Sequence, residues 1–232
     1  MPPGVETPRL NLTGAIVPAL AAAALAAIGA ILIVDSNGRR GSASVTPANC
    51  ILDNADGVGG PIDLVDANGA RVTQADFTGE PVVIYFGFTH CPDVCPTTMY
   101  TLAEALARPG GYDAQAIMIT VDPERDTPQV MGAYAHTQGF PPGLVALTGA
   151  SAQIDAAKRA FQVYSARAVG EAGGADYSVD HTSFLYVLDG QWRTRAIAST
   201  VRRENESDPQ SPILPASAGD IAACIAAGLD RH

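Results

Sequence analysis

The sequence predicts an α/β protein in which helices flank a mixed β-sheet, and three observations support this fold class. A continuous run of β-branched and aromatic residues, PVVIYFGF (81–88), is typical of a strand buried on both faces. Similar runs alternate along the chain with segments whose apolar residues recur at helical spacing. The C-terminal part then supplies a hairpin and a closing helix, which adds antiparallel strands to a parallel sheet.

The predicted strands share short apolar runs bounded by turn residues. Asn68-Gly69 separates two alternating segments in 62–73, which is the strongest local signal for a β-hairpin. Asp189-Gly190 separates two more within 182–198. Two further buried strands are expected at AIMITVD (116–122) and LVALTG (144–149). The polar, proline-containing segment 201–215 predicts an extended surface loop.

The predicted helices share clear start and stop signals. Pro96 suits a first helical turn, and RPGG ends the segment 97–107. Asp126 or Thr127 can cap a helix that ends near Gly139. Two more helices are expected, over 151–164 with Ser151 as cap and over 217–229.

The N-terminal part predicts a membrane anchor. Residues 10–34 carry no charge, and roughly 20 apolar residues suffice for a helix to cross a bilayer. We expect a cytoplasmic tail over 1–11, a transmembrane helix over 12–34, a flexible tether over 35–49 and a folded domain over 50–232. A cleaved signal peptide is the main alternative, although its apolar region is usually shorter, about 7 to 15 residues.

Composition argues against nucleic acid as a partner. The formal net charge is -10, and the basic residues form no run longer than the pairs Arg39-Arg40 and Arg202-Arg203. A protein that binds nucleic acid usually carries a basic patch, which this sequence does not supply.

The four cysteines comprise one close pair, Cys91 and Cys95, and two isolated residues, Cys50 and Cys224. Four are too few for a disulfide scaffold in a chain of this length. Cys50 and Cys224 could bridge the two ends of the domain in an oxidising compartment, or they could be inert small residues. A bridge requires their Cα atoms to lie within about 7 Å of each other.

The stretch CPDVC holds Cys91 and Cys95 between prolines. A residue before proline is disfavoured in the helical region, so the stretch should form a turn that brings the sulfurs together, with Cys95 capping the next helix. A helix N-terminus favours thiolate, which both binds soft metals and attacks disulfides. The pair could therefore be a redox couple or a metal site, whereas a structural disulfide across so short a loop would stabilise the fold little.

Two thiolates leave most metals under-coordinated, so a third ligand is expected among His90, His136, His181 and His232. His181 is the geometric favourite because it precedes a strand, where loops from neighbouring strands can meet at one edge of the sheet. A capping or core role is the alternative for a single histidine. Soft thiolates with three ligands in all favour copper over structural zinc, which usually has four.

Three motifs resemble those of the Sco/SenC family of membrane-anchored copper-binding proteins: FTHCPDVCPTTM (88–99), TVDPERDTPQVM (120–131) and YSVDHTSFLYVLD (177–189). The resemblance implies a thioredoxin-like domain behind the N-terminal transmembrane helix. It also implies Cu(I) and Cu(II) binding through Cys91, Cys95 and His181.

The resemblance further implies a role in assembling the binuclear copper centre of cytochrome c oxidase. The expected partners are the copper-centre subunit and other periplasmic copper carriers. The protein would act as a metallochaperone, as a thiol-disulfide reductase of the target cysteines, or as a redox or copper sensor. With Arg9 the only basic residue of the N-terminal tail, the sequence shows no transit peptide and indicates a bacterial inner membrane, with the domain in the periplasm.

Two carboxylates are candidates for supporting roles. Asp180 could orient His181 or serve as a docking charge, as carboxylates beside metal-binding histidines often do. Asp122 opens DPERDTP (122–128), which should border the site but is otherwise typical of a turn and a helix cap. The segment after Trp192 departs from the family pattern by its length and polarity.

Overall fold

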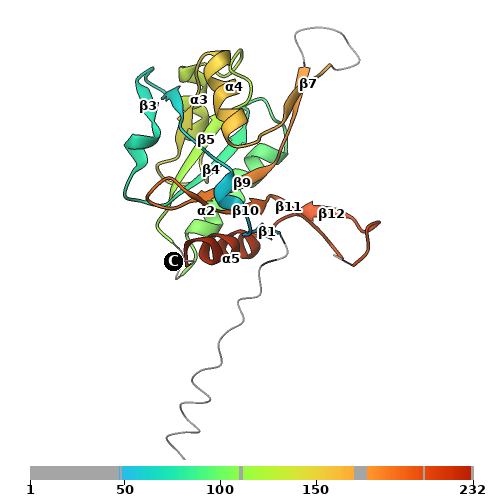
Figure 1. Ribbon diagram of the computed structural model, residues 1–232. Helices are drawn as coiled ribbons and strands as arrows, with labels where there is room; N and C mark the ends of the chain where they lie inside the picture. Colours follow the sequence, from blue (N-terminus) through green and yellow to red (C-terminus); the bar gives the residue numbers. More distant parts are fainter. Residues whose placement is uncertain (1–46, 48, 110–111, 170–176, 206, 231–232) are drawn as a thin grey trace, which may run out of the picture. The chain divides into compact units, whose positions relative to one another are not determined.

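A six-stranded mixed sheet organises the fold, in the order β1-β10-β9-β4-β5-β6 (Figure 1). The strands β4, β5 and β6 run parallel, whereas β9 is antiparallel to β4, β10 to β9 and β1 to β10. Their bounds are Cys50–Ile51 (β1), Val82–Gly87 (β4), Gln115–Thr120 (β5), Val145–Leu147 (β6), Phe184–Leu188 (β9) and Thr194–Ser199 (β10). The predicted mixed sheet is confirmed.

The computed structural model describes residues 47, 49–109, 112–169, 177–205 and 207–230. These belong to a compact unit that spans 46–232. The predicted anchor over 12–34 lies outside the described residues, as do the tail and most of the tether. Within the described residues, every helix is too short or too polar to cross a bilayer.

Among the described residues, four α-helices connect or close the sheet: α2 (Val94–Leu106), α3 (Pro128–Ala135), α4 (Ser151–Ala160) and α5 (Ala218–Leu229). Two short 3₁₀ helices precede α2: η1 (Ala55–Gly57) and η2 (Gln74–Phe77). Thr127 caps α3, since its side chain accepts a hydrogen bond from the Val130 amide, as predicted. Ser151 is instead the first residue of α4, which ends before Gln162 because that residue has a left-handed backbone (φ 54°).

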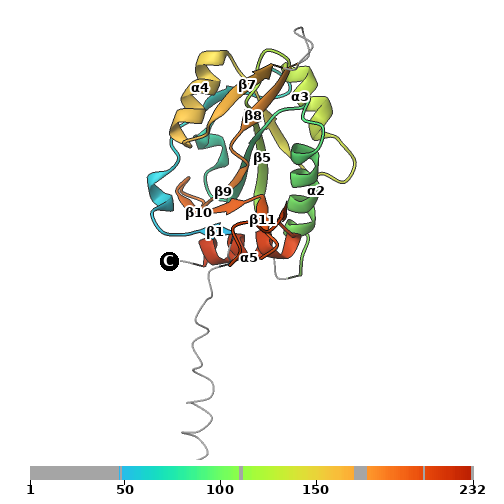
Figure 2. The same ribbon diagram turned by 90° about the vertical axis from the view of Figure 1, so that its right-hand side faces the viewer.

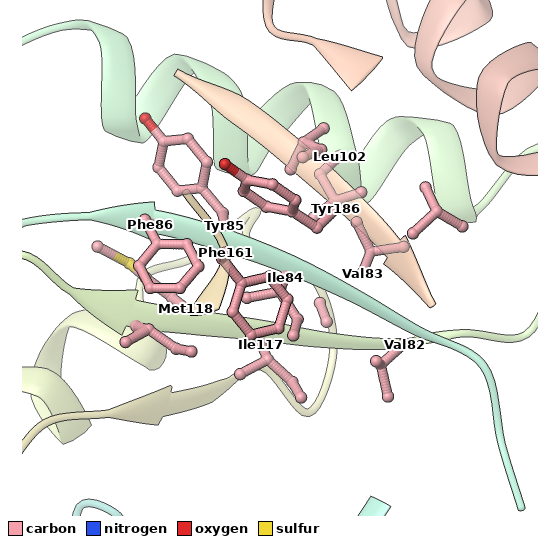
Figure 3. Close-up of a cluster of buried hydrophobic side chains, with 14 of the residues drawn as sticks. Val82, Val83, Ile84, Tyr85, Phe86, Leu102, Ile117, Met118, Phe161 and Tyr186 are labelled. Carbon is pink, nitrogen blue, oxygen red and sulfur yellow. The ribbon is translucent and has the colours of Figure 1, made fainter. Parts of the chain in front are cut away.

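The core is built around β4, every residue of which is buried. Successive side chains of a strand point to opposite faces, so Tyr85 faces α2 whereas Phe86 lies against Phe161, which follows α4 (Figure 3). The Phe86 and Phe161 ring centroids are 5.4 Å apart, and Tyr186 meets both rings edge-on. Full burial of such side chains stabilises the fold by about 1.5–3 kcal/mol each, which fixes the end of β4 where the cysteines follow.

In the part of the chain that the structure describes, three hairpins lie outside the central sheet. The hairpin of β2 (Asp63–Val65) and β3 (Arg71–Thr73) surrounds Asn68-Gly69 as predicted. A second, β7 (Ser165–Val169) with β8 (Tyr177–His181), was not predicted; the two strands lie side by side in Figure 2. The third pairs β11 (Val201–Arg203) with β12 (Ile213–Pro215), so the prediction that 201–215 is an extended loop was wrong at both of its ends.

A disulfide joins Cys50 of β1 to Cys224 of α5, with the Cα atoms 5.4 Å apart. Both cysteines are buried, and 174 residues separate them in sequence. Of the two interpretations left open by the sequence, the bridge is therefore the one that the structure contains. It ties the first strand of the domain to its last helix.

Candidate metal centre

The cysteine pair lies in the turn between β4 and α2. The Cys91 amide donates to the Phe88 carbonyl at 3.3 Å, and the Cys95 amide donates to Cys91 Sγ, also at 3.3 Å. Cys95 is the second residue of α2, and Asp93 occupies the cap position, so the prediction of Cys95 as the cap was wrong by two residues. Pro96 is accommodated because the first helical turn needs no amide donor there.

The two thiols have opposite electrostatic environments. A hydrogen bond from the Cys95 thiol lowers the pKa of half-buried Cys91 to about 4, and the nearby His181 side chain and backbone amides lower this pKa to a smaller extent. The same hydrogen bond, together with burial, raises the pKa of Cys95. At neutral pH the pair therefore holds one thiolate, on Cys91, and one thiol, on Cys95.

His181 is the last residue of β8 and lies beside the thiols. Its Nε2 is 3.7 Å from Cys95 Sγ, and its Nδ1 is 2.9 Å from the Thr182 carbonyl oxygen. A carbonyl can only accept, so Nδ1 carries the proton in neutral imidazole and Nε2 keeps a free lone pair on the sulfur side. Phe88 and Tyr85 meet the imidazole edge-on, with ring centroids 5.8 Å and 6.0 Å away.

The topology explains why these three side chains meet. The cysteines follow the carboxyl end of β4, and β9 is antiparallel to β4, so the residues before β9 lie at the same edge of the sheet. A cavity of about 270 Å³ opens there. It is lined by Phe88, Cys91, Pro92, Asp93, Val94, Ser178, Val179, Asp180, His181 and Ser183. Cys91 and His181 are therefore accessible from the cavity, whereas Cys95 is buried behind them.

Tyr85 is a residue of the site that the sequence interpretation missed. Its hydroxyl lies 3.6 Å from Cys95 Sγ, and its side chain is fully buried (Figure 3). Burial raises the pKa of Tyr85 well above its usual value, so the hydroxyl keeps its proton and can donate it to the sulfur. The available signal was a single hydroxyl on an otherwise apolar strand shortly before the cysteines.

The two candidate carboxylates lie in different places. Asp180 lines the cavity beside His181, but the Nδ1 partner within the described structure is the Thr182 carbonyl. Asp122 is buried at the carboxyl end of β5, where it accepts a 2.7 Å hydrogen bond from the Tyr177 hydroxyl and pairs with Arg125. DPERDTP therefore does more than turn the chain and cap α3.

The remaining histidines lie apart from this arrangement. The half-exposed His90 has its Nδ1 3.1 Å from Thr89 Oγ1, and His136, at the end of α3, has its Nδ1 2.7 Å from the Gly132 carbonyl. His232 lies outside the described residues.

The donor set fits a soft metal ion. In the described part of the chain, no three His, Cys, Asp or Glu side chains are already closed around a common metal position. Cys91, Cys95 and His181 are nevertheless gathered at one edge, with an imidazole lone pair directed at a sulfur. Two sulfurs and one imidazole nitrogen suit Cu(I) and also Cu(II).

Fold and site together define a class of α/β protein with a dithiol and an imidazole at the carboxyl edge of a mixed sheet. Residues 52–208 match the SCO1/SenC family, and the chain belongs to that family. It is 39% identical over 134 residues to the mitochondrial SCO1 homolog 1 of Arabidopsis thaliana. The aligned region covers 56% of this chain and 39% of that relative. It is 37% identical over 138 residues to a SCO2-like protein of Rickettsia prowazekii, and this aligned region covers 59% of this chain and 66% of that relative. The chain thus matches only part of the length of these curated relatives.

Solved structures of Sco proteins share the fold. ScoI of Bradyrhizobium japonicum with copper bound is 39% identical, with a TM-score of 0.52 over 59% of this chain and 86% of that one. Yeast Sco1 with copper bound is 28% identical, with a TM-score of 0.62 over 75% and 90%. BsSco is described as a member of the Sco family of cytochrome c oxidase assembly proteins. It is 21% identical, with a TM-score of 0.51 over 75% of this chain and 94% of that one, and this similarity shows a shared fold.

Proposed function

We propose that this chain is a membrane-anchored copper chaperone that binds Cu(I) and Cu(II) through Cys91, Cys95 and His181. Its recipient would be the binuclear copper centre of cytochrome c oxidase, in the subunit that carries it. The domain would face the periplasm of a bacterial inner membrane, held by the predicted helix over 12–34. Other periplasmic copper carriers would exchange the ion with it.

The observation that carries this proposal is the 3.7 Å approach of His181 Nε2 to Cys95 Sγ, beside a Cys91 sulfur that is already a thiolate. The copper-bound structures of similar chains from Bradyrhizobium japonicum and yeast support the choice of metal. The family's description as oxidase assembly proteins supports the recipient.

The accessible and buried donors suggest separate roles. Cys91 faces the cavity as a thiolate, so it would meet an incoming ion first without having to lose a proton. Cys95 would then give up its proton and close the pair. Two soft thiolates satisfy Cu(I), whereas Cu(II) gains most from the imidazole of His181. Asp180 and Asp122 would not bind the metal themselves. Asp180 would serve as a docking charge at the cavity, and Asp122 would act through its contacts with Tyr177 and Arg125.

The test is copper titration of the full chain with each donor replaced in turn. Cys91→Ser and Cys95→Ser should abolish stoichiometric Cu(I) binding, while His181→Ala should weaken Cu(II) far more than it alters the reduction potential of the dithiol. His136→Ala is the matched control, because this histidine follows α3 and its Nδ1 contacts the Gly132 carbonyl and not a thiol. Unchanged Cu(II) affinity and an unchanged Cu(II) spectrum in His181→Ala would refute the ligand assignment.

A second function, thiol-disulfide reduction of the oxidase's copper-ligand cysteines, is favoured by the lowered pKa of Cys91. The Cys91 thiolate would attack the target disulfide and form a mixed disulfide. Cys95, after losing its proton, would attack Cys91 Sγ, release the reduced target and leave a Cys91–Cys95 disulfide that an external thiol must reduce. In a strain lacking this protein, rescue of oxidase assembly by copper would favour delivery, and rescue by added thiol would favour reduction.

A further inference from the structure

The candidate ligands belong to two different sheets. Cys91 and Cys95 follow β4 in the six-stranded sheet, whereas His181 ends β8 in the separate β7–β8 hairpin. No ladder of backbone hydrogen bonds joins β8 to the central sheet within the described residues. The short connection from His181 to β9 brings the end of β8 to the edge of the central sheet, and side-chain contacts between the hairpin and the body of the domain hold the rest of β8 in place.

Arg125, in the loop after β5, makes several of these contacts. Its Nη1 donates to the Tyr177 carbonyl of β8 at 2.9 Å, and its Nε is paired with Asp122 Oδ2. The guanidinium carbon lies 3.7 Å from the ring centroid of Tyr177 and 5.8 Å from that of Phe88. One guanidinium thus touches the strand that carries His181 and the segment that leads to Cys91.

Neighbouring groups fix Arg125 and Tyr177 against each other. The Tyr177 hydroxyl donates to Asp122 Oδ1 at 2.7 Å, so the buried carboxylate holds both partners. Arg167, on the hairpin, also stacks on this ring, with its guanidinium carbon 4.3 Å from the Tyr177 ring centroid. The same guanidinium forms an ion pair with Glu124. The aromatic ring of β8 is therefore held by two cations, each paired to a carboxylate of the segment 122–125.

Two routes lead from this cluster to the imidazole. Tyr177 lies in the same short strand as His181, so the Nη1 contact fixes the strand near its other end. Phe88 contacts the Arg125 guanidinium on one side and meets the His181 ring edge-on, 5.8 Å between centroids. Displacement of Arg125 would free both the strand and the ring that supports the imidazole.

We propose that Arg125 is a positioning residue that anchors the β7–β8 hairpin to the body of the domain and so keeps His181 within reach of the two thiols. The inference rests on the proposed role of His181 as a copper ligand. It gives DPERDTP a function beyond capping α3. Arginine suits this position because a planar guanidinium can stack on an aromatic ring while it donates in its own plane, which a lysine ammonium cannot do.

The main test measures Cu(II) affinity of the full chain in Arg125→Gln and Arg125→Lys. Loss of an outer partner of a metal ligand typically weakens affinity about 10–100-fold, and we expect a loss of at least tenfold in both variants. Cu(I) binding and the dithiol reduction potential should change little, because both depend on the thiols. The control is Arg71→Gln, which removes an exposed ion pair with Asp63 in the β2–β3 hairpin.

A double-mutant cycle separates positioning from general destabilisation. In a His181→Ala background, Arg125→Gln should produce no further loss of Cu(II) affinity, because the residue that it positions is gone. Additive losses would overturn the proposal, as would wild-type Cu(II) affinity in Arg125→Gln. If His181→Ala itself leaves Cu(II) affinity unchanged, the proposed ligand set fails instead, so the two failures are distinguishable.

A metal-free measurement completes the test. Amide hydrogen exchange of the apo-protein should become faster over 177–181 in Arg125→Gln, with β4 and α2 still protected.

Because Arg125→Gln leaves buried Asp122 without its cation and could fail to fold, Tyr177→Leu serves as a second variant that removes the ring and keeps the ion pair. It should reproduce both the faster exchange and the loss of Cu(II) affinity. Unchanged exchange over 177–181 in whichever variant folds would contradict the anchoring role.

Discussion

The turn that carries the two cysteines and the hairpin that carries His181 are held by different kinds of interaction. The turn connects β4, which is buried throughout, to α2, and a hydrogen bond from the Cys95 amide to Cys91 Sγ joins the two cysteines across four residues. The β7–β8 hairpin is a separate two-stranded sheet, and its described contacts to the body come largely from charged and aromatic side chains. The thiol geometry is therefore set locally, whereas the imidazole is placed by tertiary contacts.

This difference teaches that the two halves of the site should fail separately. A perturbation of the core under β4 should affect the whole fold and both kinds of ligand. A perturbation of the hairpin should affect His181 and spare the dithiol. Stability in proteins is graded in this way, with peripheral hairpins opening at lower free energy than core strands.

The largest expected effect comes from the core under β4. Phe86→Ala should lower the free energy of unfolding by about 3–5 kcal/mol, because it would leave a cavity beside the two remaining rings of the cluster, Phe161 and Tyr186. Urea denaturation of the variant and the wild type measures this difference in the free energy of unfolding. Tyr164→Ala, at the approach to β7 with 65% of the residue exposed, should change stability by less than about 0.5 kcal/mol. Equal losses would remove the contrast between the two regions.

The disulfide offers the next test, since it lies at neither half of the site. A Cys50→Ala/Cys224→Ala double variant should lose about 2–5 kcal/mol of stability, because the bridge closes a loop of 174 residues in the unfolded chain. Copper affinity of the folded fraction should stay at the wild-type value. A parallel loss of copper binding would indicate that β1 and α5 take part in shaping the site.

The reactivity of Cys91 tests whether the thiols are a local unit. Its pKa of about 4 arises first from the Cys95 thiol, and His181 contributes less. Because the folded pKa is lowered, the thiolate persists from neutral pH down to about 4 and is protonated below that. Alkylation by iodoacetamide should thus be nearly constant between pH 6 and pH 8, in wild type and in His181→Ala.

The control for this experiment is the same protein unfolded in urea, where a thiol with an ordinary pKa of about 8.5 should react roughly tenfold faster for each pH unit in that interval. A tenfold rise per unit in folded His181→Ala alone would show that the imidazole, rather than Cys95, governs the thiolate.

The same contrast explains what the sequence could predict. β4, the helix after the cysteines and the looped dithiol follow from local signals: a continuous apolar run, two prolines and a helix start. The resemblance in three motifs pointed to His181 as well. The β7–β8 hairpin was missed because SARAV and YSVDH lack the β-branched or aromatic run that marks a strand.

The contacts of Arg125 and Tyr85 could not be predicted for a related reason. Arg125 touches Tyr177, which is 52 residues away in sequence, and no local pattern encodes that pairing. Tyr85 sits on a strand whose apolar run indicates only burial, so its hydroxyl contact with Cys95 emerges from the packing of β4 on α2. Local signals specify elements, whereas long-range side-chain pairs complete the site.

Tyr85 touches both halves of the site, so its hydroxyl gives the finest test of the contrast. Tyr85→Phe removes the donor to Cys95 Sγ but keeps the ring that meets His181 edge-on. The loss of one buried hydrogen bond should cost the reduced protein about 1 kcal/mol. Since 30 mV corresponds to about 1.4 kcal/mol for a two-electron couple, the dithiol potential should become roughly 20 mV more negative.

Tyr186→Phe is the matched control, because the Tyr186 side chain is also buried but its pKa is raised by burial alone, with no contribution from the thiols. Removal of the Tyr186 hydroxyl should leave the potential unchanged. The potential is measured by equilibration with a thiol buffer, and Cu(II) affinity is measured alongside. Equal shifts in both variants would assign the effect to burial in general. A Cu(II) loss in Tyr85→Phe as large as that of His181→Ala would mean that the tyrosine acts on the imidazole, and that the two halves of the site are coupled through its hydroxyl.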